Sequence, residues 1–72
     1  MRYWTLTQIG KKIGSDIIAP KGDRTKIVQY LYNVKSASTD EIAMHCGIPS
    51  ARIGTMLSLM ARKGIVKELS NG

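Results

Sequence analysis

The side chains most suited to metal binding or acid–base catalysis gather in one short segment, TDEIAMHC, which holds Asp40, Glu41, His45 and Cys46. A metal site needs three or four ligands, and the chain has no second histidine or cysteine. The two carboxylates are sequence neighbours, and adjacent residues on a helix do not converge. Glu41 follows Ser38 by three residues, which is the signature of a helix capping box. We therefore expect a helix start here, with no metal site, no cofactor and no catalytic pair.

The basic residues offer a different chemistry, the binding of polyanions. Eleven Lys and Arg against five Asp and Glu give a formal net charge of +6 on 72 residues. Such a charge favours DNA, RNA or an anionic membrane as partner, and a solubilising surface excess explains it equally well. No apolar run approaches the length of a membrane span, and no motif suggests a small-molecule ligand. A chain this short has little room for a deep substrate cleft, so an enzyme is not expected.

The rest of the composition indicates one compact domain over residues 1–72. The length is near the lower limit for a self-supporting core. A single cysteine excludes an internal disulfide framework, and the first residues do not resemble a signal peptide. We therefore expect a cytoplasmic protein, associated with the nucleoid if its source is bacterial or archaeal.

Apolar periodicity predicts the elements that position these residues. The segment RYWTLT is aromatic and β-branched, as strands are. Residues 7–17 have a helical stripe that includes Ile9 and Ile13, and Gly10 and Gly14 would let another backbone approach closely. A second helix is expected over 24–35, capped by Asp23. Its expected stripe and flanking residues are Ile27, Val28, Tyr30, Leu31 and Val34.

Two further helices and a strand complete the prediction. A helix over 39–46 ends at Gly47, which suits a left-handed C-terminal position. Pro49 prevents its continuation, and Ser50 is suited to cap a helix over 51–63. The alternating segment IVKEL then predicts a half-buried strand. The expected inward residues of these elements are Ile42, Cys46, Ile53, Met56, Leu57 and Met60.

The spacing between residues 42 and 56 resembles the helix-turn-helix of DNA-binding proteins. A small residue where two helices cross, a turn glycine and apolar anchors fall in register. The matching residues are Ile42, Ala43, Cys46, Gly47, Ile48, Ile53 and Met56. With the preceding helix and the strand KGIVKEL, the chain resembles the winged helix-turn-helix family. The resemblance implies a mainly α fold with a small β-sheet: a three-helix core plus an N-terminal strand and helix.

The wing of that family would be permuted in this chain. A phrase that often follows a wing, YWTLTQIG, stands at the N-terminus, and the chain ends on the turn dipeptide Asn71-Gly72. We therefore predict antiparallel pairing of RYWTL with Ile65–Leu69, within one chain or between two. The pairing would direct the helix 7–17 onto the core and bury Ile9 and Ile13. Pairing between chains, which would build a homodimer, is slightly favoured because a single module has few base-reading groups.

The resemblance also implies which residues would meet double-stranded DNA. The start of the helix 51–63 would enter the major groove, where arginine reads guanine, hydroxyls bond bases or phosphates, and alanine meets a thymine methyl. The implied base contacts are Ser50, Ala51, Arg52 and Thr55, with Ser58 also facing outward. The implied phosphate contacts are Arg62, Lys63, Lys67 and Arg2. The function implied is transcriptional regulation. A protein-interaction module and an RNA-binding variant of the same fold stay open as alternatives.

Overall fold

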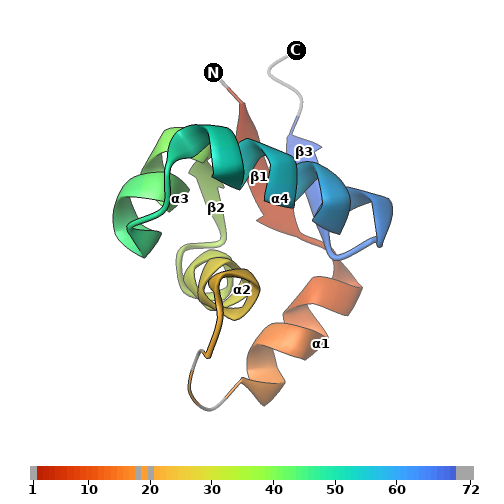
Figure 1. The fold of residues 1–72 in the computed structure, drawn as a ribbon. Coiled ribbons are helices and arrows are strands. Elements are labelled where there is room, and N and C mark those ends of the chain that lie inside the picture. The colour runs from red at the N-terminus through yellow and green to blue at the C-terminus, as the bar shows by residue number, and fades with distance from the viewer. Residues whose placement is uncertain (1, 18, 20, 70–72) are drawn as a thin grey trace.

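The computed structural model describes residues 2–17, 19 and 21–69 and contains four helices and three strands in that part of the chain (Figure 1). The elements in order are β1 (Tyr3–Leu6), α1 (Gln8–Asp16), α2 (Asp23–Val34), β2 (Ser36–Ser38), α3 (Thr39–Cys46), α4 (Ser50–Arg62) and β3 (Val66–Leu69). The three central helices lie within one residue of their predicted bounds. None of the helices described is long and apolar enough to cross a membrane.

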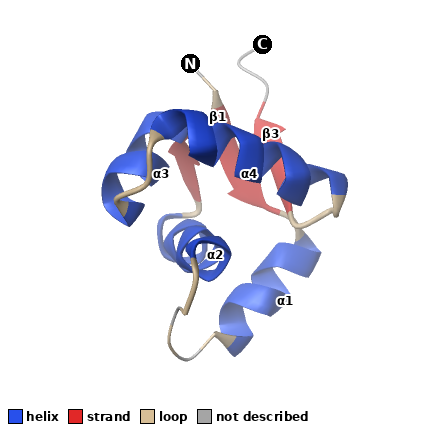
Figure 2. Cartoon of the chain, in the orientation of Figure 1, coloured by secondary structure: helices blue, strands red, loops and turns tan. Residues whose placement is uncertain are grey.

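The three strands form one antiparallel sheet with β1 in the middle, in the order β2-β1-β3. The sheet lies behind α4 in Figure 2. Tyr3 pairs with Leu69 and Leu6 with Val66, so the start of β1 and the end of β3 lie side by side. The predicted pairing of the N-terminal strand with the last strand is therefore confirmed. It forms within one chain, so the slightly favoured pairing between chains is wrong. Asn71-Gly72 lies outside the described residues.

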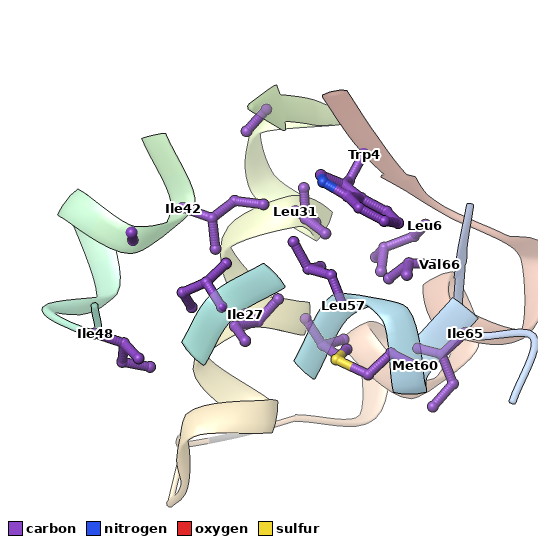
Figure 3. Close-up of a cluster of buried hydrophobic side chains, with 14 residues drawn as sticks. Trp4, Leu6, Ile27, Leu31, Ile42, Ile48, Leu57, Met60, Ile65 and Val66 are labelled. Carbon is purple, nitrogen blue, oxygen red and sulfur yellow. The ribbon is translucent and has the colours of Figure 1, made fainter. Parts of the chain in front are cut away.

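The fold is winged-helix-like, with α2, α3 and α4 as its core and β1 in the place of a returning wing strand. Figure 3 shows the apolar side chains that meet between the helices and the sheet. Trp4, on β1, is 1% exposed, and its indole N–H donates to the Thr39 hydroxyl at 2.9 Å. The other fully buried large side chains are Ile27, Val28, Leu31, Ile42, Ile53, Leu57 and Val66.

The turn between α3 and α4 follows its sequence signals. Gly47 has a left-handed φ of 69°, and Ile48 is buried beneath it. Ser38 and Glu41 form the expected capping box, with each side chain accepting from the other residue's backbone N–H at 3.1 Å. Ala43 and Ile53 are both buried, as a close crossing of the two helices requires.

Helix α1 packs by a different face from the one predicted. Ile9 is 58% exposed and Ile13 37% exposed, whereas Gly10 and Gly14 are buried. A Cβ on Gly10 would overlap the carbonyl oxygen of Ile65, and one on Gly14 would press on the Tyr32 ring at 2.9 Å. The two glycines therefore bring α1 against the chain, as their small size allows, and this rotates the isoleucines outward.

Smaller predictions about caps and termini were also wrong. Val34 is exposed at the end of α2 rather than part of its buried stripe. Gly22, not Asp23, is the N-cap of α2, and the Thr25 hydroxyl accepts from its N–H at 3.0 Å. Pro49, not Ser50, precedes α4. The short strand β2 was missed.

Candidate nucleic-acid interface

One face of α4 is turned away from the core and carries four side chains in a stripe. Ile53, Leu57 and Met60 hold the helix against the core. At 100° per residue, the opposite side holds Ala51, Thr55, Ser58 and Arg62, and all four are exposed. We call these four residues the α4 outer face. Three of them are small, so another surface could approach the helix backbone closely there.

The polar groups of the α4 outer face keep some hydrogen-bonding capacity. The Thr55 hydroxyl donates to the carbonyl oxygen of Ala51 at 3.2 Å, so its own oxygen can still accept. Arg62, in the last turn, forms no ion pair with any residue the structure describes. Its guanidinium keeps its donors for a phosphate or a base edge.

Ser50 and Asp40 meet at the start of α4. The Ser50 hydroxyl donates to the Asp40 carboxylate at 3.3 Å, and both residues are exposed. A helix N-terminus attracts anions, and Asp40 places a negative charge beside it. Ser50 is therefore already engaged, and the carboxylate opposes a phosphate at this end of the helix.

Arg52 lies on a flank of α4 rather than on the α4 outer face. Its Nη2 atom is 3.3 Å from Oδ2 of Asp23, at the start of α2. Exposed pairs of this kind contribute only about 0–1 kcal/mol, so a stronger acceptor could take the guanidinium. Lys63 lies on the same flank, about 80° or more away from the stripe at 100° per residue.

The two basic residues expected at the wing position have different surroundings. Arg2 bonds both carboxylate oxygens of Glu68, at 2.8 and 3.1 Å, and stacks over the Trp4 ring at 4.8 Å. These hydrogen bonds lower the pKa of the Glu68 carboxyl and raise the pKa of Arg2. Lys67 is exposed, and because strand side chains alternate it faces away from the buried side of Val66.

The expected site residues are therefore only partly brought together. Four of them share the α4 outer face. Ser50 and Arg52 are held by carboxylates, Arg2 directly precedes β1, and Lys67 lies on β3. Sequence reasoning missed Asp23, Asp40 and Glu68 as partners. Of these, only the Arg2–Glu68 pair had a signal, because the predicted strand pairing brings residues 2 and 68 to the same end of the sheet.

The segment with metal-capable side chains is used for packing. The His45 ring stacks on Tyr30 with 4.1 Å between ring centroids. Cys46 is partly buried, and burial raises the pKa of its thiol. No group of three or more His, Cys, Asp or Glu that could hold a metal ion occurs in the described part of the chain.

Comparison with known proteins identifies the family of this helix-turn-helix. A family model described as FeoC-like transcriptional regulator matches residues 25–72, well over half of the chain. The chain belongs to the FeoC-like transcriptional regulator family. Searches of curated proteins and of solved structures each found no match.

The FeoC-like match begins at residue 25, within α2, and runs past the end of β3, so it covers the whole helix-turn-helix with the α4 outer face. It leaves out β1 and α1, although β1 is the central strand of the sheet. The resemblance to winged helix-turn-helix proteins is thus confirmed at the level of the family. For β1 and α1, only the structure shows how these residues fit into the fold.

Proposed function

We propose that this FeoC-like protein regulates transcription by binding double-stranded DNA, with α4 in the major groove. The observation that carries the proposal is the α4 outer face. It is an exposed stripe of small and polar side chains on the second helix of a helix-turn-helix. That helix is the one that enters the groove in DNA-binding proteins of this kind.

The side chains of the α4 outer face favour a close approach of the helix to DNA more than they favour strict recognition of a base sequence. Ala51 and Thr55 can meet a thymine methyl, and Thr55 can also accept a hydrogen bond from a base. Arg62 supplies a cation for a phosphate, which positions the protein without specifying sequence. Arg52 joins as a guanine reader when it leaves Asp23. The net charge of +6 supplies the general attraction to the DNA backbone.

The sheet contributes a second contact in this proposal. Lys67 on β3 and Arg2 beside β1 stand where the wing of the family would be. Lys67 is exposed and forms no ion pair with a described residue, so it is the stronger candidate for a phosphate. Arg2 must release Glu68 before it can serve the same purpose.

Ser58→Glu tests the placement of the α4 outer face. It puts a carboxylate into the stripe, and we expect it to weaken binding to every duplex by at least about 1 kcal/mol through repulsion of the phosphates. Ser15→Glu is the matched control, since Ser15 is an exposed helical serine on α1. Fluorescence anisotropy with random and genomic duplexes at two salt concentrations measures both variants. If Ser58→Glu binds DNA as well as Ser15→Glu does, α4 does not enter the groove.

A further inference from the structure

A shallow concavity lies on the side of α4 that turns toward the start of α2. It has a volume of about 130 Å³ and is lined by Arg24, Met56, Leu59, Met60 and Lys63. Met56, Leu59 and Met60 recur at helical spacing on one side of α4, and Lys63 is the C-cap residue directly after the helix. We call these five residues the α4 flank. It is a different side of α4 from the outer face that carries Ala51, Thr55, Ser58 and Arg62.

The α4 flank exposes apolar surface that the fold does not use. Leu59 is 52% exposed, and it lines the concavity together with the partly buried Met56 and the buried Met60. The apolar surface extends toward α1, because the side chain of Ile9 approaches Gly64, the residue after Lys63. Ile9 is itself 58% exposed, and Ile13 follows one turn later. Contiguous apolar surface with a polar rim is typical of interaction sites.

The rim of the α4 flank is cationic. Arg24 and Lys63 form no ion pair within the part of the chain that the structure describes, whereas the neighbouring Arg52 is paired with Asp23. Two uncompensated positive charges therefore stand beside an apolar concavity. A complementary ligand needs an apolar group and carboxylates near it.

We propose that the α4 flank binds an acidic amphipathic helix of a partner protein. One leucine- or methionine-sized side chain fills the concavity beside Leu59, and carboxylates on the same helix meet Arg24 and Lys63. A second apolar side chain, one or two turns further along, rests on Ile9. This is the helix-in-groove mode of recognition, in which apolar anchors at helical spacing supply the affinity. The proposal goes beyond DNA binding and does not depend on it.

Two other occupants fit the α4 flank less well. A second copy of this chain would bring the same cations together in a symmetric interface, and each copy already carries a net charge of +6. DNA would satisfy Arg24 and Lys63 but would leave Met56 and Leu59 without a function, because phosphates gain nothing from apolar contact.

The test uses a fluorescein-labelled peptide with leucines along one helical face and glutamates on both borders of that face, followed by fluorescence polarisation. We expect saturable binding to the parent protein and at least tenfold weaker binding to Leu59→Ser. Met44→Ser is the matched control, because Met44 is an 85% exposed apolar residue on α3; it should bind like the parent. The double variant Arg24→Ala/Lys63→Ala should also lose at least tenfold, and Lys12→Ala should not.

Four results would overturn the proposal. The first is no saturable binding of the peptide. The second is equal binding of a peptide with serines in place of leucines, which would indicate charge attraction alone. The third is a parent dimer in sedimentation that Leu59→Ser dissociates, which would assign the surface to a second copy. The fourth is a loss of duplex affinity in Leu59→Ser as large as that in Arg62→Ala, which would assign it to DNA. Thermal unfolding confirms that each variant is folded, and the duplex measurements on Ser58→Glu report separately on the proposed regulator function.

Discussion

Asp40 and Ser50 set the electrostatic environment at the start of α4, where a DNA backbone would approach in the proposed complex. The carboxylate accepts from the Ser50 hydroxyl and lies in the first turn of α3. There it favours α3 through the helix dipole, yet it repels a phosphate near α4. The same charge therefore supports the fold and opposes the proposed ligand.

Asp40→Asn should separate these two effects. We expect tighter duplex binding by up to about 1 kcal/mol, the interaction of two charges roughly 4 Å apart in water. We also expect a loss of folding stability of about 0.3–1 kcal/mol from the weaker dipole interaction. Anisotropy titrations and thermal unfolding measure the two. Asp16→Asn, at the far end of α1, is the control for net charge. Unchanged or weaker duplex binding in Asp40→Asn would remove this end of α4 from the DNA contact.

The Arg2–Glu68 pair joins β1 to β3 and predicts a dependence of stability on pH. The hydrogen bonds from Arg2 lower the pKa of Glu68 in the folded protein below its ordinary value. A lowered carboxyl pKa stabilises the fold above the ordinary pKa, and this contribution is lost as the pH falls through the lowered pKa. The pair is exposed, so its contribution is small.

Glu68→Gln should therefore be less stable than the parent at neutral pH and equal to it in strong acid, near pH 2. Urea unfolding of both proteins across this range measures the difference. Arg2→Gln should show the same convergence, because it removes the other half of the pair. A difference that stays constant with pH would mean that the ion pair does not contribute.

Helix α1 shows where apolar periodicity fails as a guide to packing. The pattern assumes that the largest apolar side chains are buried, and it selected Ile9 and Ile13. In the structure the closest approach is made by backbone, through Gly10 against Ile65 and Gly14 against Tyr32. The sequence does contain the signal, which is two glycines one turn apart. Nothing in the sequence, however, indicates that α1 packs through Gly10 and Gly14 rather than through Ile9 and Ile13.

Gly10→Ala and Gly54→Ala form a matched pair that tests the close contact of α1, because each substitution replaces a helical glycine. A Cβ on Gly10 would overlap a backbone oxygen that cannot move aside, whereas one on Gly54 would meet nothing within 4 Å. We expect Gly10→Ala to destabilise the protein by about 1–3 kcal/mol. Gly54→Ala should stabilise it by up to about 1 kcal/mol, the gain in helix propensity. Chemical denaturation measures both, and equal effects of the two substitutions would contradict the close approach of α1.

The other elements could be predicted where local sequence signals determine them, and could not where residues far apart in the chain determine them. The helices α2, α3 and α4 were predictable because the capping box of α3, the Gly47 turn and a 3.6-residue period are local signals. Strand β2 was not, because three residues carry too little pattern and the chain enters it through a positive φ of 73° at Lys35. The α4 outer face followed from a helical wheel. The Arg52–Asp23 and Ser50–Asp40 pairs did not, since each joins residues that only the fold brings together.

At the scale of the whole molecule, the sheet is completed within one chain. The strands that were expected to link two copies pair with each other instead, so the sheet gives no reason for a dimer. A homodimer that reads two half-sites about one DNA turn apart stays a prediction, and it would need another surface.

Because β1 is the central strand of the sheet, we expect the fold to require the N-terminal residues, although the family match begins only at residue 25. Removing a buried tryptophan such as Trp4 costs about 3–5 kcal/mol. Total stabilities are about 5–15 kcal/mol, and a chain this short belongs at the lower end. A protein without residues 1–6 should therefore lose its sheet and most of its helical signal in circular dichroism. A truncated chain that keeps its helices and melts like the parent would show that β1 is dispensable.

A circular permutant distinguishes the need for β1 from the need for its position in the chain. Joining residue 72 to residue 1 and opening the chain after Lys21 gives the order α2, β2, α3, α4, β3, β1, α1, the usual winged-helix order. Tyr3 and Leu69 already pair, and the joined residues contain the Asn-Gly signal of a hairpin turn. We expect the permutant to fold with a circular dichroism spectrum like that of the parent, and to bind duplexes at least as well. Its failure to fold, with the parent stable under the same conditions, would mean that β1 needs its own N-terminal start and does not act as the returning strand of a wing.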